Sequence, residues 1–173
     1  MWLVRRLPAS PYRAGMASLP HRVARLFRRR PRAGVGPVPD TAGALGDTDL
    51  TYRPRADGVP DVGEVVWGWV PYEEDDGRGK DRPILVIGRR ADSLLGLMLT
   101  SKDHDRDADD EARHGRTWMD VGSGAWDRSG RPSEVRLDRL LVMAAADVRR
   151  EGAALDHALF DRVVAAARHV QGW

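Results

Sequence analysis

From residue 62 onward, short apolar segments alternate with polar segments rich in turn residues. Six of the apolar segments contain four to eight residues, carry mainly aliphatic, β-branched or aromatic side chains, and are separated by glycine, proline, aspartate or serine. They are residues 63–70, 84–87, 94–100, 116–122, 133–137 and 139–144. Segments of this length and composition predict β-strands. Many short strands separated by turns predict a small barrel.

A helical pattern follows at the C-terminal end. In DHALFDRVVAAARHV, residues 156–170, apolar residues recur three or four positions apart. The resulting stripe consists of Leu159, Phe160, Val163, Val164, Ala167 and Val170. This spacing is typical of an amphipathic helix with one buried face, and Asp156 is suited to cap its first turn. The predicted fold class is therefore mainly β (α+β), a barrel of about six or seven strands with a C-terminal helix.

The residues before the barrel differ from it in composition. Residues 1–33 contain nine arginines and no acidic residue, which predicts a basic arm that is disordered or, over HRVARLFRRRPR, partly helical. The arm could contact nucleic acid or an anionic membrane, or could be a plain tail, with Met16 as an alternative start. Residues 34–60 are rich in glycine and proline and predict a linker. The barrel domain is then expected over residues 61–173.

The net charge of +2 conceals an asymmetry along the chain. Residues 1–60 hold 11 arginines and four aspartates, a balance of +7, so residues 61–173 carry −5. The chain lacks cysteine, which excludes disulfides and thiolate zinc sites and fits the reducing cytoplasm, although a cysteine-free secreted protein would look the same. No apolar run approaches the roughly 20 residues that span a bilayer. A cytoplasmic location without membrane insertion is therefore expected.

Five pieces of the sequence occur in an order that points to one protein family. They are GEVVWGWVP, RPILVIG, LTSKDH, RPSEVRLDRLLVM and the closing helix, all within residues 61–170. Together they resemble the MazF/PemK family, the toxin endoribonucleases of type II toxin–antitoxin systems. The resemblance implies an SH3-like barrel that forms a homodimer. It also implies cleavage of single-stranded RNA at short sequence sites, without a metal or other cofactor, restrained by a cognate antitoxin.

The resemblance assigns the catalytic arginine to Arg82 and the catalytic hydroxyl to Thr100. Arginine suits RNA cleavage because its planar guanidinium matches two phosphoryl oxygens. Because arginine holds its proton far above neutral pH, we expect Arg82 to stabilise charge first, and proton donation is a second role that the resemblance suggests. Pro83 holds the residue before it in an extended conformation, and we expect it at the first position of a strand. Thr100 ends the next strand, where its hydroxyl could bond a phosphoryl oxygen.

Polar residues beside this pair are further candidates for the site. His104 could act as a general base, because histidine exchanges protons near neutral pH. It shares a strand face with Thr100 and Lys102 if that strand continues, and a solvated loop histidine is the alternative. Phosphate contacts, groove-lining polar groups and base stacking are assigned to Lys80, Ser101, Lys102, Ser133, Arg136 and Trp126. Purely structural roles are the alternative for the last three.

Acidic residues complicate this interpretation. The aspartates of DHDRDADDE, residues 103–111, imitate the start of a calcium-binding loop, but Ala108 replaces the required glycine and His114 the required glutamate. We therefore expect a solvated acidic loop and no metal site. EEDD, residues 73–76, opposes the approach of RNA unless the loop moves or a basic segment covers it. One hypothesis is that the arginine-rich arm covers these acidic loops and modulates access.

Two other functions are compatible with these residues. A degenerate barrel of this family, or one like the CcdB toxins that share the fold without nuclease activity, would be a pure binding module. A domain whose basic arm binds nucleic acid without catalysis is the other alternative. Such a protein would lose binding on truncation of the arm and would tolerate Arg82→Ala, whereas a ribonuclease would lose cleavage in that variant.

Overall fold

The structure, a computed structural model, describes residues 36–37, 45–74, 77–104 and 108–173. The described residues belong to one unit, Pro31–Trp173. The predicted basic arm, residues 1–33, lies outside the described residues, and so does part of the predicted linker.

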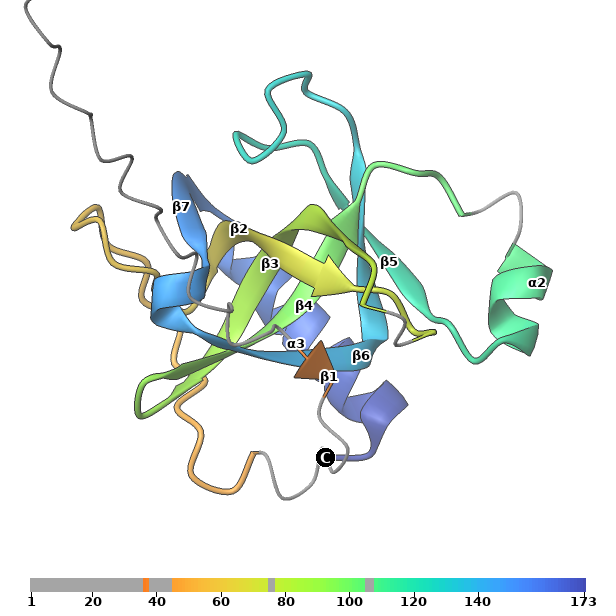
Figure 1. Cartoon of the computed structure of the whole chain (residues 1–173), viewed down its shortest axis with the longest axis horizontal. Helices are drawn as coiled ribbons and strands as arrows, with labels where there is room; N and C mark the ends of the chain where they lie inside the picture. The colour runs from red at the N-terminus through yellow and green to blue at the C-terminus, as the bar shows by residue number, and fades with distance from the viewer. Residues whose placement is uncertain (1–35, 38–44, 75–76, 105–107) are drawn as a thin grey trace, which may run out of the picture. The chain divides into compact units, whose positions relative to one another are not determined.

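The described strands form one antiparallel sheet that curls into a half-open barrel (Figure 1). The order along the sheet is β1-β6-β4-β3-β2-β7, and β5 pairs with the first part of β6. The strands are β1 (Gly36–Pro37), β2 (Glu64–Pro71), β3 (Gly79–Arg90), β4 (Ser93–Thr100), β5 (Trp118–Gly122), β6 (Ser133–Ala144) and β7 (Arg149–Ala154). The prediction of a mainly β fold with about six or seven strands is confirmed.

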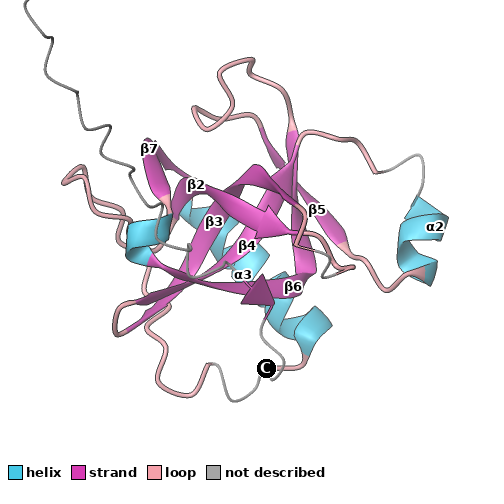
Figure 2. Ribbon diagram, viewed as in Figure 1, coloured by secondary structure: helices cyan, strands magenta, loops and turns pink. Residues whose placement is uncertain are grey.

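Helix α3, His157–Gln171, follows the sheet, packs against β6 and lies behind the strands in Figure 2. Asp156 caps it by accepting a hydrogen bond from the backbone N–H of Leu159 at 3.1 Å, as predicted. The helix ends at Gly172, whose φ of 74° is a left-handed conformation that glycine adopts without strain. Within the part of the chain that the structure describes, no helix is long and apolar enough to cross a membrane.

Three elements differ from the sequence-based expectation. Residues 133–144 form one strand, β6, rather than two. Strand β7 escaped prediction because RREGAA lacks apolar alternation; it forms by pairing with β2. Helix α2, Ala108–Arg113, occupies part of the segment expected to be a solvated loop, and it stands beside β5 in Figure 1. Strand β6 and helix α2 both turn out to shape the candidate site.

An irregularity in the pairing of β4 with β6 bends β6. Leu97 is opposite Leu140 and Leu99 is opposite Val135, so two steps along β4 correspond to five along β6. Extra residues of this kind bend a strand and re-aim its side chains. The residues in the bend, 136–139, have the sequence RLDR. Two arginines and an aspartate are thereby presented close together.

The core lies between the curled sheet and α3. Its fully buried side chains come from every long strand and from the apolar stripe of the helix, and include Val65, Ile84, Leu95, Leu140 and Val163. Burying one such side chain contributes about 1.5–3 kcal/mol. The core therefore fixes the strands whose ends carry the candidate site.

Residues 45–60, part of the predicted linker, pack against the barrel. Tyr52 donates its hydroxyl hydrogen to the carbonyl of Leu155 at 2.7 Å and stacks on His157 with ring centroids 4.2 Å apart. The close fit requires Gly63, whose φ is 97° and where a Cβ would lie 2.4 Å from the Tyr52 ring. The domain boundary at residue 61 stays a prediction, and these contacts tie the preceding segment to the barrel.

Candidate active site

A cavity of about 540 Å³ lies on one face of the sheet and is lined by residues of β2, β3, β4 and β6. The register pairs the core residue Ile84 of β3 with Met98 of β4. Alternation along each strand then places Arg82 and Thr100 on the same face as this pair. Met98, Arg82 and Thr100 all line the cavity, together with the buried Val70 of β2. The cavity thus has an apolar base and a polar wall provided by the strands themselves.

Arg82 lies in this wall and is half-buried. Burial lowers the pKa of its guanidinium, because taking a cation out of water favours the neutral form, and Tyr72 partly offsets this effect. Within the described residues, Arg82 forms no ion pair. Asp81, its neighbour in the sequence, binds Arg149 instead, at 2.5 Å. The positive charge of Arg82 is therefore left without a carboxylate.

Pro83 lies inside a strand rather than at its first position, because β3 begins at Gly79. The expectation about its position is wrong. The proline is nevertheless tolerated, since pairing of β3 with β4 starts only at Ile84 and Pro83 is paired solely with Trp67 of β2. Arg82 is consequently held in an extended segment with one side unpaired.

Thr100, the last residue of β4, is buried at the edge of the cavity. Its Oγ1 accepts a hydrogen bond from the backbone N–H of Lys102 at 3.2 Å. A hydroxyl that accepts from the backbone still has its own hydrogen to donate. The geometry therefore leaves Thr100 able to donate a hydrogen bond to an anionic oxygen.

His104 is buried and held by Glu134 of β6, whose position the register places opposite Thr100. Its Nδ1 lies 2.7 Å from Oε2 of Glu134, and its backbone N–H donates to Oε1 at 3.1 Å. Because the carboxylate accepts, Nδ1 carries the hydrogen and Nε2 keeps a lone pair in the neutral ring. His104 also lines the cavity with Thr100 and Lys102, although β4 ends at Thr100 and the expected continuation of the strand does not occur.

The indole of Trp118, on β5, fixes the plane of the His104 ring. The two rings are parallel within 3°, with centroids 4.0 Å apart. Trp118 donates its Nε1–H to Oε2 of Glu111 at 3.0 Å, which lowers the pKa of that carboxyl. The guanidinium of Arg136 lies 5.8 Å from the Trp118 centroid. The roles of Glu134 and Glu111 were not predictable from the sequence, because they depend on the pairing of β6 with β4 and on helix α2.

Two of the arginines around the cavity are neutralised by carboxylates. Arg136 is buried, donates from Nη2 and Nε to Asp138 at 2.7 and 3.0 Å, and also binds Glu73. Arg116 donates to the other oxygen of Glu73 at 2.9 Å. These contacts raise the pKa of Arg136 above its usual range despite its burial. RNA contact by Arg136, a prediction from the sequence, would require Glu73 to give way.

Arg139, which the sequence did not single out, is a further arginine at this cavity. It is only 8% exposed and donates from Nη2 to the backbone carbonyl of Pro71 at 2.9 Å. Burial, followed by the positive charge of Arg136, lowers the pKa of Arg139. Like Arg82, it forms no ion pair with any described carboxylate.

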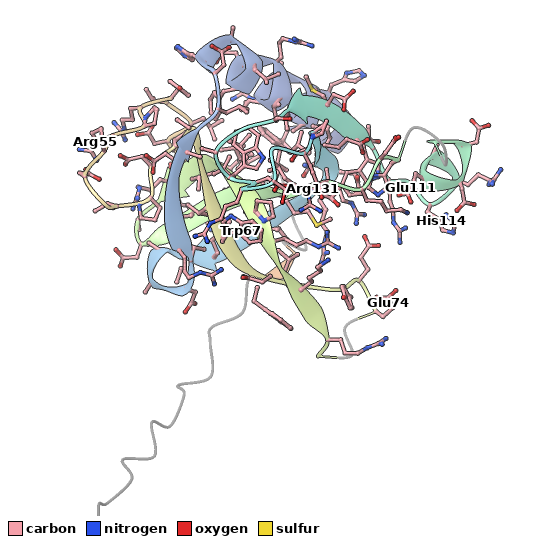
Figure 3. The ribbon with its side chains drawn as sticks, turned by 90° about the horizontal axis from the view of Figure 1, so that it is seen from above. Arg55, Trp67, Glu74, Glu111, His114 and Arg131 are labelled. Carbon is pink, nitrogen blue, oxygen red and sulfur yellow. The ribbon has the colours of Figure 1, made fainter. Side chains whose placement is uncertain are left out.

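The remaining sequence candidates lie around the edge. Lys80 and Lys102 are exposed at the main cavity. Ser101 and Ser133 line a smaller cavity of about 150 Å³, which shares Lys80, Arg82 and Thr100 with the main one. Figure 3 shows the acidic residues Glu74 and Glu111 on one side of the molecule, where both line the main cavity.

Trp126 is placed away from the main cavity. It is 5% exposed, and its Nε1–H donates to the hydroxyl of Ser133 at 3.1 Å. The indole thus belongs to the core cluster and presents no open face on which a base could stack.

These features define a small antiparallel half-barrel with a C-terminal helix and a cationic cavity on β3, β4 and β6. Residues 61–170 match the family described as PemK-like, MazF-like toxin of type II toxin-antitoxin system. The match covers more than half of the chain, so the chain belongs to this family, and the predicted membership is confirmed.

Among solved structures, the chain is similar to one reported as the crystal structure of MazE-MazF (Form-II) from Deinococcus radiodurans. The identity is 20% and the TM-score 0.42, over 67% of this chain and 95% of that chain. No curated protein sequence matches the chain.

Proposed function

We propose that this toxin-family domain is an endoribonuclease that cleaves single-stranded RNA through attack by the ribose 2′-hydroxyl, without a metal or other cofactor. One observation carries the proposal. A single cavity combines an arginine without a counter-ion, a hydroxyl able to donate, and an imidazole whose tautomer is fixed, namely Arg82, Thr100 and His104. Family membership supports the same activity.

In the proposed reaction, Nε2 of His104 accepts the proton of the 2′-hydroxyl. The 2′-oxygen then forms a bond to the adjacent phosphorus, and the bond from phosphorus to the 5′-oxygen breaks. The 5′-oxygen takes a proton from solvent, so the products are a 2′,3′-cyclic phosphate and a 5′-hydroxyl. Glu134 holds the ring in the tautomer that this step needs and stabilises the imidazolium that forms.

Negative charge builds up on the phosphoryl oxygens during this step. The guanidinium of Arg82 offers two parallel donors to that charge, and the hydroxyl of Thr100 offers a third. Groups that are already oriented, in a site partly shielded from water, stabilise such charge more strongly than water does. Lys80, Ser101 and Lys102 would bind flanking phosphates at the edge.

The experiment is incubation of the full chain with a long single-stranded RNA in EDTA, followed by mapping of the RNA ends. We expect cleavage that survives chelation and produces 5′-hydroxyl ends. Arg82→Ala should reduce the rate about 100- to 1,000-fold, and His104→Ala should reduce it about 100- to 10,000-fold. Arg162→Ala, an exposed arginine on α3, is the control and should cleave like the wild type. Absence of cleavage by the wild-type protein would instead favour a binding module.

The same proposal extends to partners and location. A ribonuclease of this family would need a cognate antitoxin that covers the cavity, and it would act as a homodimer where RNA is present, in the cytoplasm. Copurification with the product of an adjacent coding sequence, with loss of RNA cleavage in the complex, tests the antitoxin. Light scattering of the isolated chain tests the dimer.

A further inference from the structure

Arg139 is buried at the cavity without an ion pair to any described carboxylate, and the charges of Glu73 and Asp138 offset only part of the effect of burial on its pKa. It sits in the bend of β6, and its residue is only 8% exposed. The hydrogen bond to the carbonyl of Pro71 satisfies one donor but does not supply the ion pair that a buried cation needs. A buried cation without a carboxylate is strongly disfavoured unless an anion is bound in the functional state.

The nearest carboxylates are already engaged elsewhere. Asp138 receives hydrogen bonds from Arg136 and from the backbone N–H of Thr117, the latter at 2.7 Å. Glu73 bridges Arg136 and Arg116. Both acidic groups thus neutralise other arginines of the wall. The sequence alone could not distinguish Arg136 from Arg139, which are three residues apart on one strand.

Arg139 and Arg82 line the same cavity, and neither forms an ion pair with a described carboxylate. They come from β6 and β3, two strands that β4 separates in the sheet. The positive charge of Arg82 contributes to the lowered pKa of Arg139. Two uncompensated guanidinium groups in one cavity form a site for a group with two or more negative charges.

We propose that Arg139 is a second phosphate-binding residue, which contacts the same phosphoryl group as Arg82 from the β6 side of the cavity. This inference rests on the proposed ribonuclease function. The phosphorus passes through a five-coordinate state that carries one more negative charge than the starting diester, so a second guanidinium acts most strongly there. Planar bidentate donation explains why an arginine, rather than a lysine, would occupy this buried position.

The test compares wild-type protein with Arg139→Gln and Arg139→Lys, and uses Arg162→Ala as the control. Circular dichroism first establishes that each variant is folded. Binding is measured by fluorescence anisotropy on a 2′-deoxy oligonucleotide, which cannot be cleaved by the proposed route, between about 50 and 300 mM salt. Loss of one phosphate contact should reduce the slope of log K against log salt by about 0.7. A merely structural role for Arg139 would not change this slope.

We expect Arg139→Gln to reduce the slope of log K against log salt by about 0.7. The same substitution should slow single-turnover cleavage about 100-fold. Arg139→Lys should keep the slope, since it keeps the charge, and should still lose rate. A folded Arg139→Gln with unchanged slope and rate overturns the proposal. If Arg139→Gln does not fold, Arg139→Lys decides: an unchanged rate overturns the proposal and a reduced rate with an unchanged slope supports it.

The two proposals fail in different ways. A wild-type protein that binds the oligonucleotide but cleaves no RNA refutes the ribonuclease, whereas the salt slope still decides the role of Arg139 as a phosphate ligand. A wild-type protein that binds no oligonucleotide overturns both.

Discussion

Replacing Glu73 by glutamine removes the carboxylate that bridges two arginines of the cavity. Glu73 accepts from Arg116 at 2.9 Å and from Arg136. Desolvation opposes its ionisation, but the hydrogen bonds and charge of Arg136 and Arg116 outweigh this and lower its pKa. It is therefore a carboxylate at neutral pH, and it occupies donors that an RNA phosphate would otherwise use. Binding of RNA at this wall must displace it.

The size of the effect follows from the exposure of these groups. The side chain of Glu73 is 39% exposed, so solvent and salt screen both of its ion pairs. Screened pairs of this kind contribute about 0.2–1 kcal/mol each. Removing both competing ion pairs should favour RNA binding by up to about 2 kcal/mol, which corresponds to a Kd lower by up to about 30-fold.

The assay is fluorescence anisotropy with the uncleavable 2′-deoxy oligonucleotide at low salt. Glu74→Gln is a matched control, because Glu74 is exposed on the same loop and forms no ion pair with any described residue. It removes the same charge without freeing an arginine, so we expect a change of about twofold or less. An equal effect of both variants, or a Kd that rises in Glu73→Gln, would refute the idea that this carboxylate competes with phosphate.

Two further predictions concern residues that hold the site and the fold. Glu134→Gln should slow cleavage about 100-fold or more, because an amide can turn either its oxygen or its NH₂ toward Nδ1 of His104 and no longer fixes the tautomer. RNA binding should change little, and a comparison of the single-turnover rate with the Kd for RNA checks both expectations. The hydrogen bonds from Arg55 lower the pKa of Asp61 below its usual 3.8, so this group stabilises the fold above about pH 4 and loses its effect as the pH falls through the lowered pKa. Asp61→Asn should thus reduce the free energy of unfolding by about 1–3 kcal/mol at pH 7, and urea denaturation should show the difference from wild type shrinking toward pH 3.

Much of the barrel could be predicted because its strands are short apolar runs. The composition of such a segment is enough, without its neighbours in space, to predict a buried strand. Residues 84–87 and 94–100 are examples, and both lie within the observed β3 and β4. Strand β7 could not be predicted in this way, since RREGAA is held by its pairing with β2 rather than by its own pattern. Helix α2 was not predicted for a different reason, because its acidic sequence resembles that of a solvated loop.

The candidate site was only partly predictable. Thr100, Lys102 and His104 do line one cavity, but β4 ends at Thr100, so strand alternation does not place the last two. The partner of His104 was not predictable, because Glu134 reaches it through the register of β6 with β4. The difference between Arg136 and Arg139 was not predictable either. It arises from the bend in β6, which gives Arg136 two carboxylate partners and leaves Arg139 with a backbone carbonyl.

The central claim is that this cavity cleaves RNA through the ribose 2′-hydroxyl. The most direct test uses an RNA that contains one mapped cleavage site. The RNA is prepared with and without a single 2′-deoxy substitution on the ribose 5′ to the scissile phosphate, and each form is incubated with wild-type protein in EDTA. The account predicts that the unsubstituted RNA is cut to a 2′,3′-cyclic phosphate and that the substituted bond stays intact. Cleavage of the substituted bond at the same rate would contradict the account.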